Sequence, residues 1–164
     1  MLKKALILLS CIVVTIGVWF IGLEVVYAHI LAFISNVLLG MSGSEAHIAI
    51  EQQDGIHSFA AHTLYDGREA RFGQQFHTLL YPTIMMLAWH GFTAIIRGWK
   101  QSLSSAKWNI GLFMAVQILF LLLLTNYMSD LANFFYYLLH DSFYIVALVI
   151  IIVDNLRNPV FGRV

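Results

Sequence analysis

Charge, proline and cysteine are scarce in this chain of 164 residues. Charged residues make up 11% of it, and it holds two prolines and one cysteine, whereas 60% of its residues are apolar. So little charge excludes an ordinary soluble domain, in which about a quarter of residues are charged. A single cysteine excludes an intrachain disulfide, and Cys11 is interpreted as a small residue inside a helix. The nine basic and nine acidic residues balance, and no phosphate-binding motif occurs, so we expect no nucleic-acid partner.

The chain is instead rich in long apolar runs. Crossing a bilayer core takes about 20 residues of helix, and we predict transmembrane helices at about 5–28, 78–96, 108–127 and 132–153. The predicted fold is an all-α membrane protein, a four-helix bundle forming a single domain over 1–164, with the lipid bilayer as its first partner. Residues 5–39 would form a helix about 52 Å long at 1.5 Å per residue. We therefore expect a bend near Gly22 or after Ala28.

The basic residues predict the orientation of the chain. In this four-span scheme two of them, Arg68 and Arg71, fall on one side, and seven fall on the other: Lys3, Lys4, Arg97, Lys100, Lys107, Arg157 and Arg163. Cytoplasmic flanks are rich in Lys and Arg, so both termini are expected in the cytoplasm of a bacterium, with the chain in its inner membrane. The first run, which ends near Val26-Tyr27-Ala28, also fits a cleaved signal peptide. Its length favours an uncleaved anchor.

The extracytoplasmic loop, about 40–76, contains two Asp-Gly pairs. Asp-Gly between alternating segments is a strong signal for a two-residue hairpin turn. Turns at Asp54-Gly55 and Asp66-Gly67 predict a three-stranded antiparallel meander over about 47–74. In its register, paired residue numbers sum to 109 and then to 133. One face then holds the apolar residues Ile48, Ile50, Phe59, Ala61, Ala70 and Phe72, and the other holds His47, Glu51, Ser58, His62, Glu69 and Arg71.

Histidines supply the candidate metal ligands. The predicted register sets His47 directly opposite His62, with Glu51 on the same face, an arrangement that fits either the start of a zinc or copper site or a solvated polar face. A second group, His29, His77 and His140, maps to the outer ends of the predicted helices. Polar residues at membrane depth often mark functional sites, although hydrogen-bonded structural roles fit each of these histidines as well.

Haem and covalent chemistry remain open in the same region. His77 and His90 are 13 residues apart on one helix, and a haem on His77 would take His140 or His29 as its second ligand, whereas His90 has no such partner. A nucleophile needs a neighbouring base, and the weak candidate pair is Thr83 with His140. We expect no cofactor beyond such a metal or haem.

The stretch "FMAVQILFLLLLTNYMSDLANFFYYLLHDSFYIVAL" resembles the last two elements of the exosortase and archaeosortase family. The resemblance covers the architecture of about residues 20–155. Members of that family are multi-pass membrane transpeptidases, and their motif is a cysteine, an arginine and a histidine at the outer ends of successive helices. His140 stands at the histidine position. No cysteine stands in "QFHTLLYPT" and no arginine in "FLLLLTN", so the resemblance implies a non-catalytic relative or companion protein.

The function predicted from the sequence is therefore that of an accessory subunit. It would belong to a bacterial envelope sorting, export or assembly complex, and it would bind other membrane proteins or further copies of itself. One alternative is a metal- or haem-dependent membrane enzyme with a histidine site on its outer face. The other is an exosortase-like peptidase with an atypical nucleophile such as Thr83. Whether the chain is an enzyme stays open, and the missing motif residues favour a non-enzyme.

Overall fold

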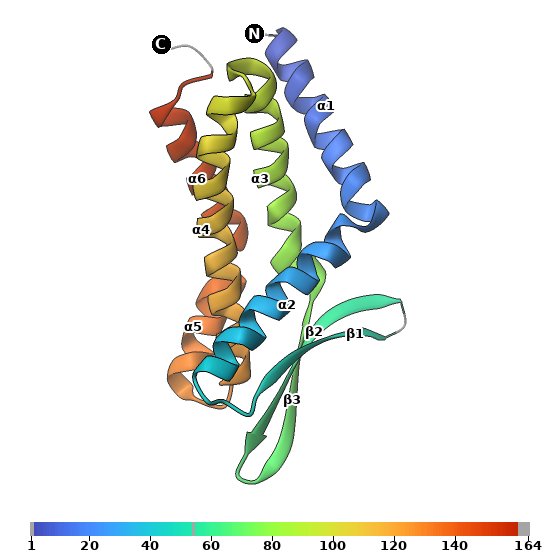
Figure 1. The fold of residues 1–164 in the computed structure, drawn as a ribbon, viewed down its shortest axis with the longest axis vertical. Helices are drawn as coiled ribbons and strands as arrows, with labels where there is room; N and C mark the ends of the chain where they lie inside the picture. Colours follow the sequence, from blue (N-terminus) through green and yellow to red (C-terminus); the bar gives the residue numbers. More distant parts are fainter. Residues whose placement is uncertain (1, 54, 161–164) are drawn as a thin grey trace. The chain divides into compact units, whose positions relative to one another are not determined.

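The computed structural model describes residues 2–53 and 55–160 (Figure 1). In chain order the elements are α1 (Leu2–Val18), a π-helical turn η1 (Trp19–Leu23), α2 (Glu24–Met41), β1 (His47–Gln53), β2 (Ile56–Tyr65), β3 (Arg68–Gln75), α3 (Phe76–Arg97), α4 (Trp99–Thr125), α5 (Asp130–His140) and α6 (Phe143–Arg157). They form two compact units: unit 1 contains residues 1–24, 81–113 and 144–164, and unit 2 contains residues 25–80 and 114–143. The prediction of a single domain stays a prediction.

Among the described residues, three helical runs are long and apolar enough to cross a membrane. They are Leu2–Met41, Phe76–Arg97 and Trp99–Thr125, and the bent pair α5 and α6 makes a fourth if it is counted as one span. The expected break near Gly22 is confirmed, because Gly22 has a φ of 144°, which interrupts the helix there. Two boundaries differ from the prediction. Helix α4 begins at Trp99 rather than near 108, and the expected helix over 132–153 is divided at Asp141-Ser142.

Unit 1 has an aromatic core. Buried Trp89 and Phe92 of α3 pack together with Val160, which follows α6, and half-buried residues of α1 and α6 cover them. The Nζ of Lys4 donates a hydrogen bond to the carbonyl oxygen of Val160, with an Nζ–O distance of 2.6 Å. The segment after α6 is therefore tied to both α1 and α3.

Unit 2 joins the sheet to helices through buried polar contacts. Tyr27 of α2 donates to the Gln117 side chain of α4 at 2.6 Å, and Gln117 donates to the carbonyl oxygen of Leu79 at 2.6 Å. Tyr136 of α5 donates to the side chain of Gln74 in β3, again at 2.6 Å. Each of these polar side chains is buried, so each bond satisfies a group that would otherwise be costly to remove from solvent.

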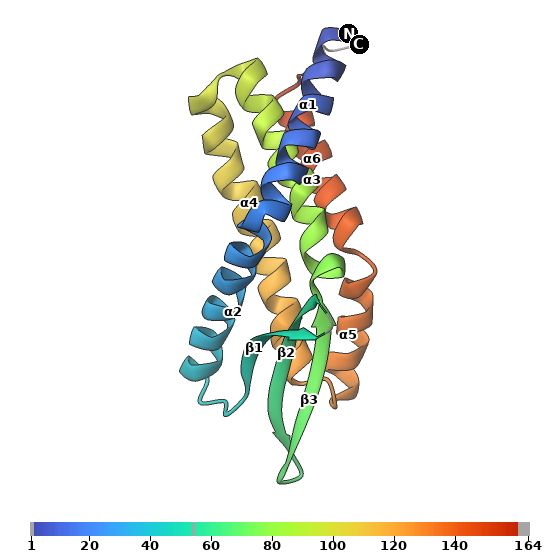
Figure 2. The ribbon, with the colours of Figure 1, turned by 90° about the vertical axis from the view of Figure 1, so that its right-hand side faces the viewer.

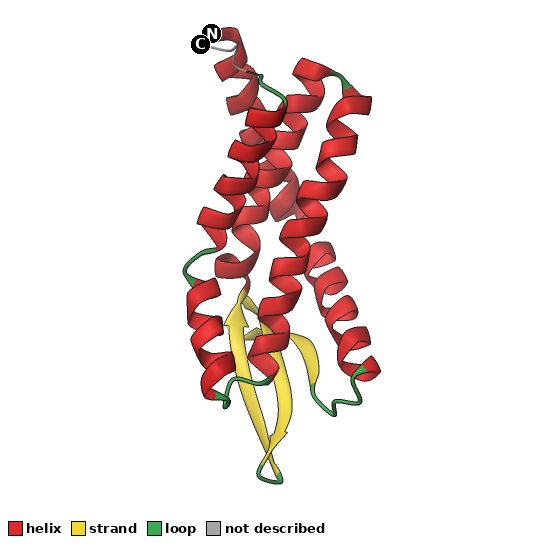
Figure 3. Cartoon of the chain, turned by 90° about the vertical axis from the view of Figure 1, so that its left-hand side faces the viewer, coloured by secondary structure: helices red, strands yellow, loops and turns green. Residues whose placement is uncertain are grey.

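The three strands form one antiparallel sheet in the order β1-β2-β3 (Figure 3). The predicted register is confirmed, since His47 pairs with His62 and Gln53 with Ile56 across the first turn, and Tyr65 pairs with Arg68 across the second. Asp66 and Gly67 have φ values of 49° and 72°, as a type I′ turn requires. Asp54, in the first turn, lies outside the described residues.

The predicted separation of the two faces is confirmed in part. Ile50, Ala70 and Phe72 of the predicted apolar face are half-buried, and Ala60, on the opposite face, is fully buried. Ile48, Phe59 and Ala61 are buried, with at most 3% of each residue exposed. None of the six residues predicted for the polar face is buried. Along the outer edge of β1, Asn36 of α2 takes the place of a neighbouring strand. Its side-chain amide donates to the carbonyl oxygen of Ile48 at 2.9 Å and accepts from the Ile48 N–H at 2.7 Å.

Candidate functional site

The polar face of the sheet brings together two of the candidate histidines. The rings of His47 and His62 are stacked, with centroids 4.8 Å apart and planes 5° from parallel. Cross-strand pairing sets this separation, because residues directly opposite in an antiparallel sheet hold their Cβ atoms about 5 Å apart. With Glu45, Thr63, Leu64 and Glu69 they line a surface pocket of about 260 Å³.

Glu51 links the three strands on the same face. One of its oxygens accepts a hydrogen bond from Nε2 of His62 at 3.1 Å, and the other forms an ion pair with Arg71 of β3. The hydrogen bond from Arg71, helped by the one from His62, holds the pKa of the Glu51 carboxyl below its ordinary value. The carboxylate of Glu51 in β1 thus bonds to a side chain of β2 and to a side chain of β3.

The stacking of the two imidazole rings determines whether His47 and His62 can bind one metal ion together. Imidazole binds a metal through an in-plane lone pair at about 2.0–2.1 Å for zinc. The parallel rings of His47 and His62 direct such lone pairs side by side rather than toward one point. Over residues 2–53 and 55–160, no group of three or more His, Cys, Asp or Glu side chains is placed to hold a metal ion.

The remaining histidine candidates lie in unit 2 with separate surroundings. His29 has its Nδ1 2.8 Å from the carbonyl oxygen of Val25, within the same helix. His77 is exposed in the first turn of α3. His140 is the last residue of α5, where its Nδ1 lies 2.8 Å from a carboxylate oxygen of Asp141 and its ring lies against that of Tyr136, with centroids 5.9 Å apart.

Thr83, the candidate nucleophile, is buried in α3 and belongs to unit 1, whereas His140 belongs to unit 2. The proposed catalytic pair is therefore drawn from different units of the chain.

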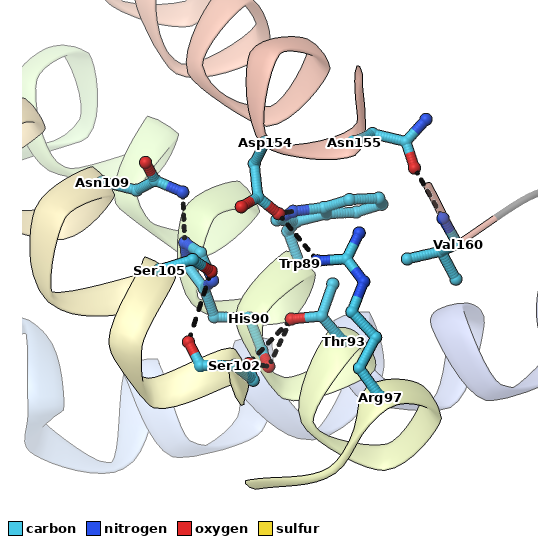
Figure 4. A network of polar contacts seen from close by, with 10 residues as sticks. All are labelled: Trp89, His90, Thr93, Arg97, Ser102, Ser105, Asn109, Asp154, Asn155 and Val160. Carbon is cyan, nitrogen blue, oxygen red and sulfur yellow. Dashed lines mark hydrogen bonds and ion pairs between the residues drawn. The ribbon is translucent and has the colours of Figure 1, made fainter. Parts of the chain in front are cut away.

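Unit 1 contains a buried ion pair that the sequence did not single out. Figure 4 shows Asp154 of α6 facing two side chains of α3. Nε1 of Trp89 donates to Oδ2 of Asp154 at 2.8 Å, and Nη1 of Arg97 lies 3.2 Å from the same oxygen. The side chains of Arg97 and Asp154 are only 9% and 2% exposed. Nε and Nη2 of Arg97 are buried without a hydrogen-bond partner.

A second group of polar contacts joins α3 to the start of α4. The hydroxyl groups of Thr93 and Ser102 both donate to the carbonyl oxygen of His90, at 3.1 and 2.9 Å, and their oxygens lie 2.8 Å apart. The Asn109 amide lies 3.4 Å from Nε2 of His90, and Nδ1 of His90 is buried without a partner (Figure 4). These bonds hold the α3–α4 turn in place.

The sequence pattern does not predict the pair of Asp154 and Arg97, because each residue stands at the end of an apolar run, where charges are expected in solvent. The sequence does hold one signal for the pair. In the four-span scheme both residues fall on the same side of the membrane, where Asp154 is an acid among several basic residues. Opposite charges at one depth of neighbouring helices often pair. The two positions are 57 residues apart in the chain, which hides their pairing from any local sequence pattern.

No protein-family model matches the chain, and no curated protein or solved structure matches it either. Its function therefore has to be inferred from its residues and their geometry.

Proposed function

We propose that this chain is a non-catalytic accessory subunit of a bacterial envelope sorting, export or assembly complex. In this proposal the apolar helices cross the inner membrane, both termini lie in the cytoplasm and the sheet lies on the outer side. The excess of basic residues on the side of the termini supports the orientation. The long apolar helices support the membrane location.

The observation that carries the proposal is the exposed β2–β3 hairpin. Its end extends beyond α2 and α5 of the same unit (Figures 1 and 2). Leu64 and Tyr65 are 52% and 48% exposed beside the turn, and Arg68 follows it. Tyrosine and arginine are enriched at protein–protein interfaces and among the residues that contribute most to binding. The hairpin therefore suits the role of a docking element for a partner protein outside the membrane.

The surroundings of the polar candidates also support a structural role. His29 and His140 make local hydrogen bonds, and Glu51 links the strands. Asp154 joins two helices of unit 1. Groups bonded in this way stabilise a scaffold.

The test is capture of the partner by the full chain in mild detergent from native membranes. A double variant, Tyr65→Ala with Arg68→Ala, removes the two hairpin side chains. Losing one strong interface residue weakens binding by about 2 kcal/mol or more, roughly 30-fold, so the partner should be lost. The matched control is Trp108→Ala, at a 79% exposed aromatic position in α4. A partner that the hairpin variant retains as well as the control does would refute docking by the hairpin.

The competing enzyme functions make different predictions for the same preparation. A metal- or haem-dependent enzyme would be coloured or metal-loaded, and would lose the metal or haem in His77→Ala or His140→Ala. An exosortase-like peptidase would lose peptide cleavage in Thr83→Ala. An absorption spectrum, a metal analysis and a cleavage assay on one purified sample separate these outcomes from the accessory function.

A further inference from the structure

Unit 1 has a long apolar groove between α1 and α3. Its volume is about 680 Å³, and its lining runs along α1 from Lys3 to Thr15 and along α3 from Gly91 to Ile95, with Trp99 at one end. The α1 helix has no buried residue of its own, so it leaves the groove open along its length.

A second apolar groove lies on the other side of α3, toward α4. Its volume is about 240 Å³, and it shares Gly91, Ala94 and Trp99 with the first groove. Because glycine has no side chain and alanine only a methyl group, α3 forms a low ridge between the two grooves. The paired grooves thus flank one ridge and meet at Trp99.

The length of the grooves separates two kinds of occupant. From Lys3 to Thr15, α1 rises about 18 Å at 1.5 Å per residue, close to half of a hydrocarbon core about 30 Å thick. A transmembrane helix of a partner would need the full thickness. An acyl chain of one membrane leaflet needs only half, and two neighbouring grooves that share residues of α3 suit the two chains of one phospholipid.

Charge at the end of the first groove indicates the headgroup. Lys3 lines that end, and Lys100 follows Trp99 in the chain. Both are exposed, unlike Lys4, whose ammonium group binds the carbonyl oxygen of Val160. Trp99 is 70% exposed, as expected for an indole at a membrane interface.

We propose that unit 1 binds one anionic diacyl phospholipid, with an acyl chain on each side of the Gly91–Ala94 ridge and its phosphate at Lys3. The basic residue and the apolar grooves recognise different parts of the same molecule. This inference rests on the membrane location in the proposed function but not on any partner protein.

Filling the ridge tests the acyl-chain sites. A Cβ added at Gly91 meets no atom within 4 Å, and the same is true at Gly111, which is exposed on α4 away from both grooves. Gly91→Leu therefore adds apolar bulk to the ridge at a position where a Cβ meets no protein atom, and Gly111→Leu is the matched control. Binding of phosphatidylglycerol to the delipidated full chain is measured by native mass spectrometry. We expect Gly91→Leu to weaken it about tenfold, the equivalent of roughly two methylene groups left unburied.

Removing the charge tests the headgroup site. Lys3→Gln should lower phosphatidylglycerol affinity about fivefold, as expected for one lysine near an anionic lipid. Phosphatidylcholine carries the same phosphate with a choline cation beside it, so its affinity should fall by a smaller factor. Lys107→Gln, at an exposed lysine of α4 outside both grooves, is the control and should change neither affinity.

Three results would overturn the proposal. The first is equal binding by Gly91→Leu and Gly111→Leu, and the second is equal affinity of the unaltered protein for the two lipids. The third is a disulfide between the Cys11 residues of two copies after mild oxidation, since Cys11 lines the groove and such a bond would assign the groove to a second copy. Lipid binding is measured without a partner, so its failure is distinct from a failure of hairpin docking.

Discussion

Removing one member of the buried pair Arg97–Asp154 should strongly destabilise unit 1. In Asp154→Leu the guanidinium group stays buried with no opposite charge, and the indole N–H of Trp89 loses its acceptor. Breaking a buried ion pair in this way costs about 3–5 kcal/mol. Arg97→Met leaves the carboxylate buried with the neutral donors Trp89 and Ser105 but no opposite charge, and its expected cost is also about 3–5 kcal/mol.

The double variant Arg97→Met with Asp154→Leu isolates the interaction. Both charges are then gone, so the main remaining cost is the unpaired indole N–H of Trp89, about 1–3 kcal/mol. The double variant should therefore be more stable than either single variant, although independent changes would add to about 6–10 kcal/mol. The difference measures the coupling between the two charges.

The assay is reversible unfolding in mixed detergent micelles, followed by circular dichroism at several fractions of denaturing detergent. Asp130→Asn, at an exposed acid at the start of α5, is the control and should stay within about 0.5 kcal/mol of the unaltered protein. Losses that simply add in the double variant would refute the reasoning, because they would show that the two charges do not depend on one another.

Three further changes have defined outcomes. Asn36→Leu leaves backbone groups of β1 unpaired, at a cost of about 1–3 kcal/mol, visible as faster amide exchange in that strand. Gly22→Ala places a side chain at a φ of 144° and should cost more than about 1 kcal/mol in thermal unfolding, whereas Gly17→Ala, inside α1, should not destabilise. The pKa of Glu51 should lie below its ordinary value in a carbon-13 NMR titration and rise in Arg71→Gln. Because folding lowers this pKa, Glu51 stabilises the fold at pH values above the ordinary carboxyl pKa. This stabilisation is lost as the pH falls through the lowered pKa. An unshifted pKa of Glu51 would contradict the ion pair.

The sheet was predictable from the sequence in detail because its signals are local. Each Asp-Gly pair sets a two-residue turn, and a two-residue turn leaves one register for the strands beside it. Face assignment then follows from the alternation of side chains along a strand. The pairing of His47 with His62 across the first turn therefore follows from the sequence.

The helix boundaries were harder to predict, because hydropathy indicates whether a segment lies in an apolar environment and not whether its backbone is helical. The polar stretch "WKQSLSSAKW" precedes the predicted helix over 108–127, yet it is helical from Trp99, since a helix can continue where it leaves the apolar layer. Gly98, with a φ of 95°, is the actual break. In the same way Asp141 and Ser142 interrupt a run whose mean hydropathy stays high, and only these two polar residues signalled the division of α5 from α6.

The contacts of unit 1 could not be predicted because they join distant segments. Trp89 and Asp154 are 65 residues apart, and their hydrogen bond depends on how α3 and α6 are rotated about their own axes. A single sequence carries no direct signal for that rotation. The paired grooves were hidden for the same reason, since Gly91 and Ala94 are unremarkable residues in an apolar helix.

The side chain of Asn36 affects how this protein behaves among other copies of itself. A bare edge strand offers unpaired amides and carbonyls to any other extended chain, which is a route to aggregation. On β1 the side-chain amide of Asn36 makes hydrogen bonds with the N–H and the carbonyl oxygen of Ile48. On β3 the other edge carries charged residues, which oppose the approach of another strand: Arg68, Glu69 and Arg71. The hairpin can therefore stay exposed while both edges of the sheet resist pairing with another strand.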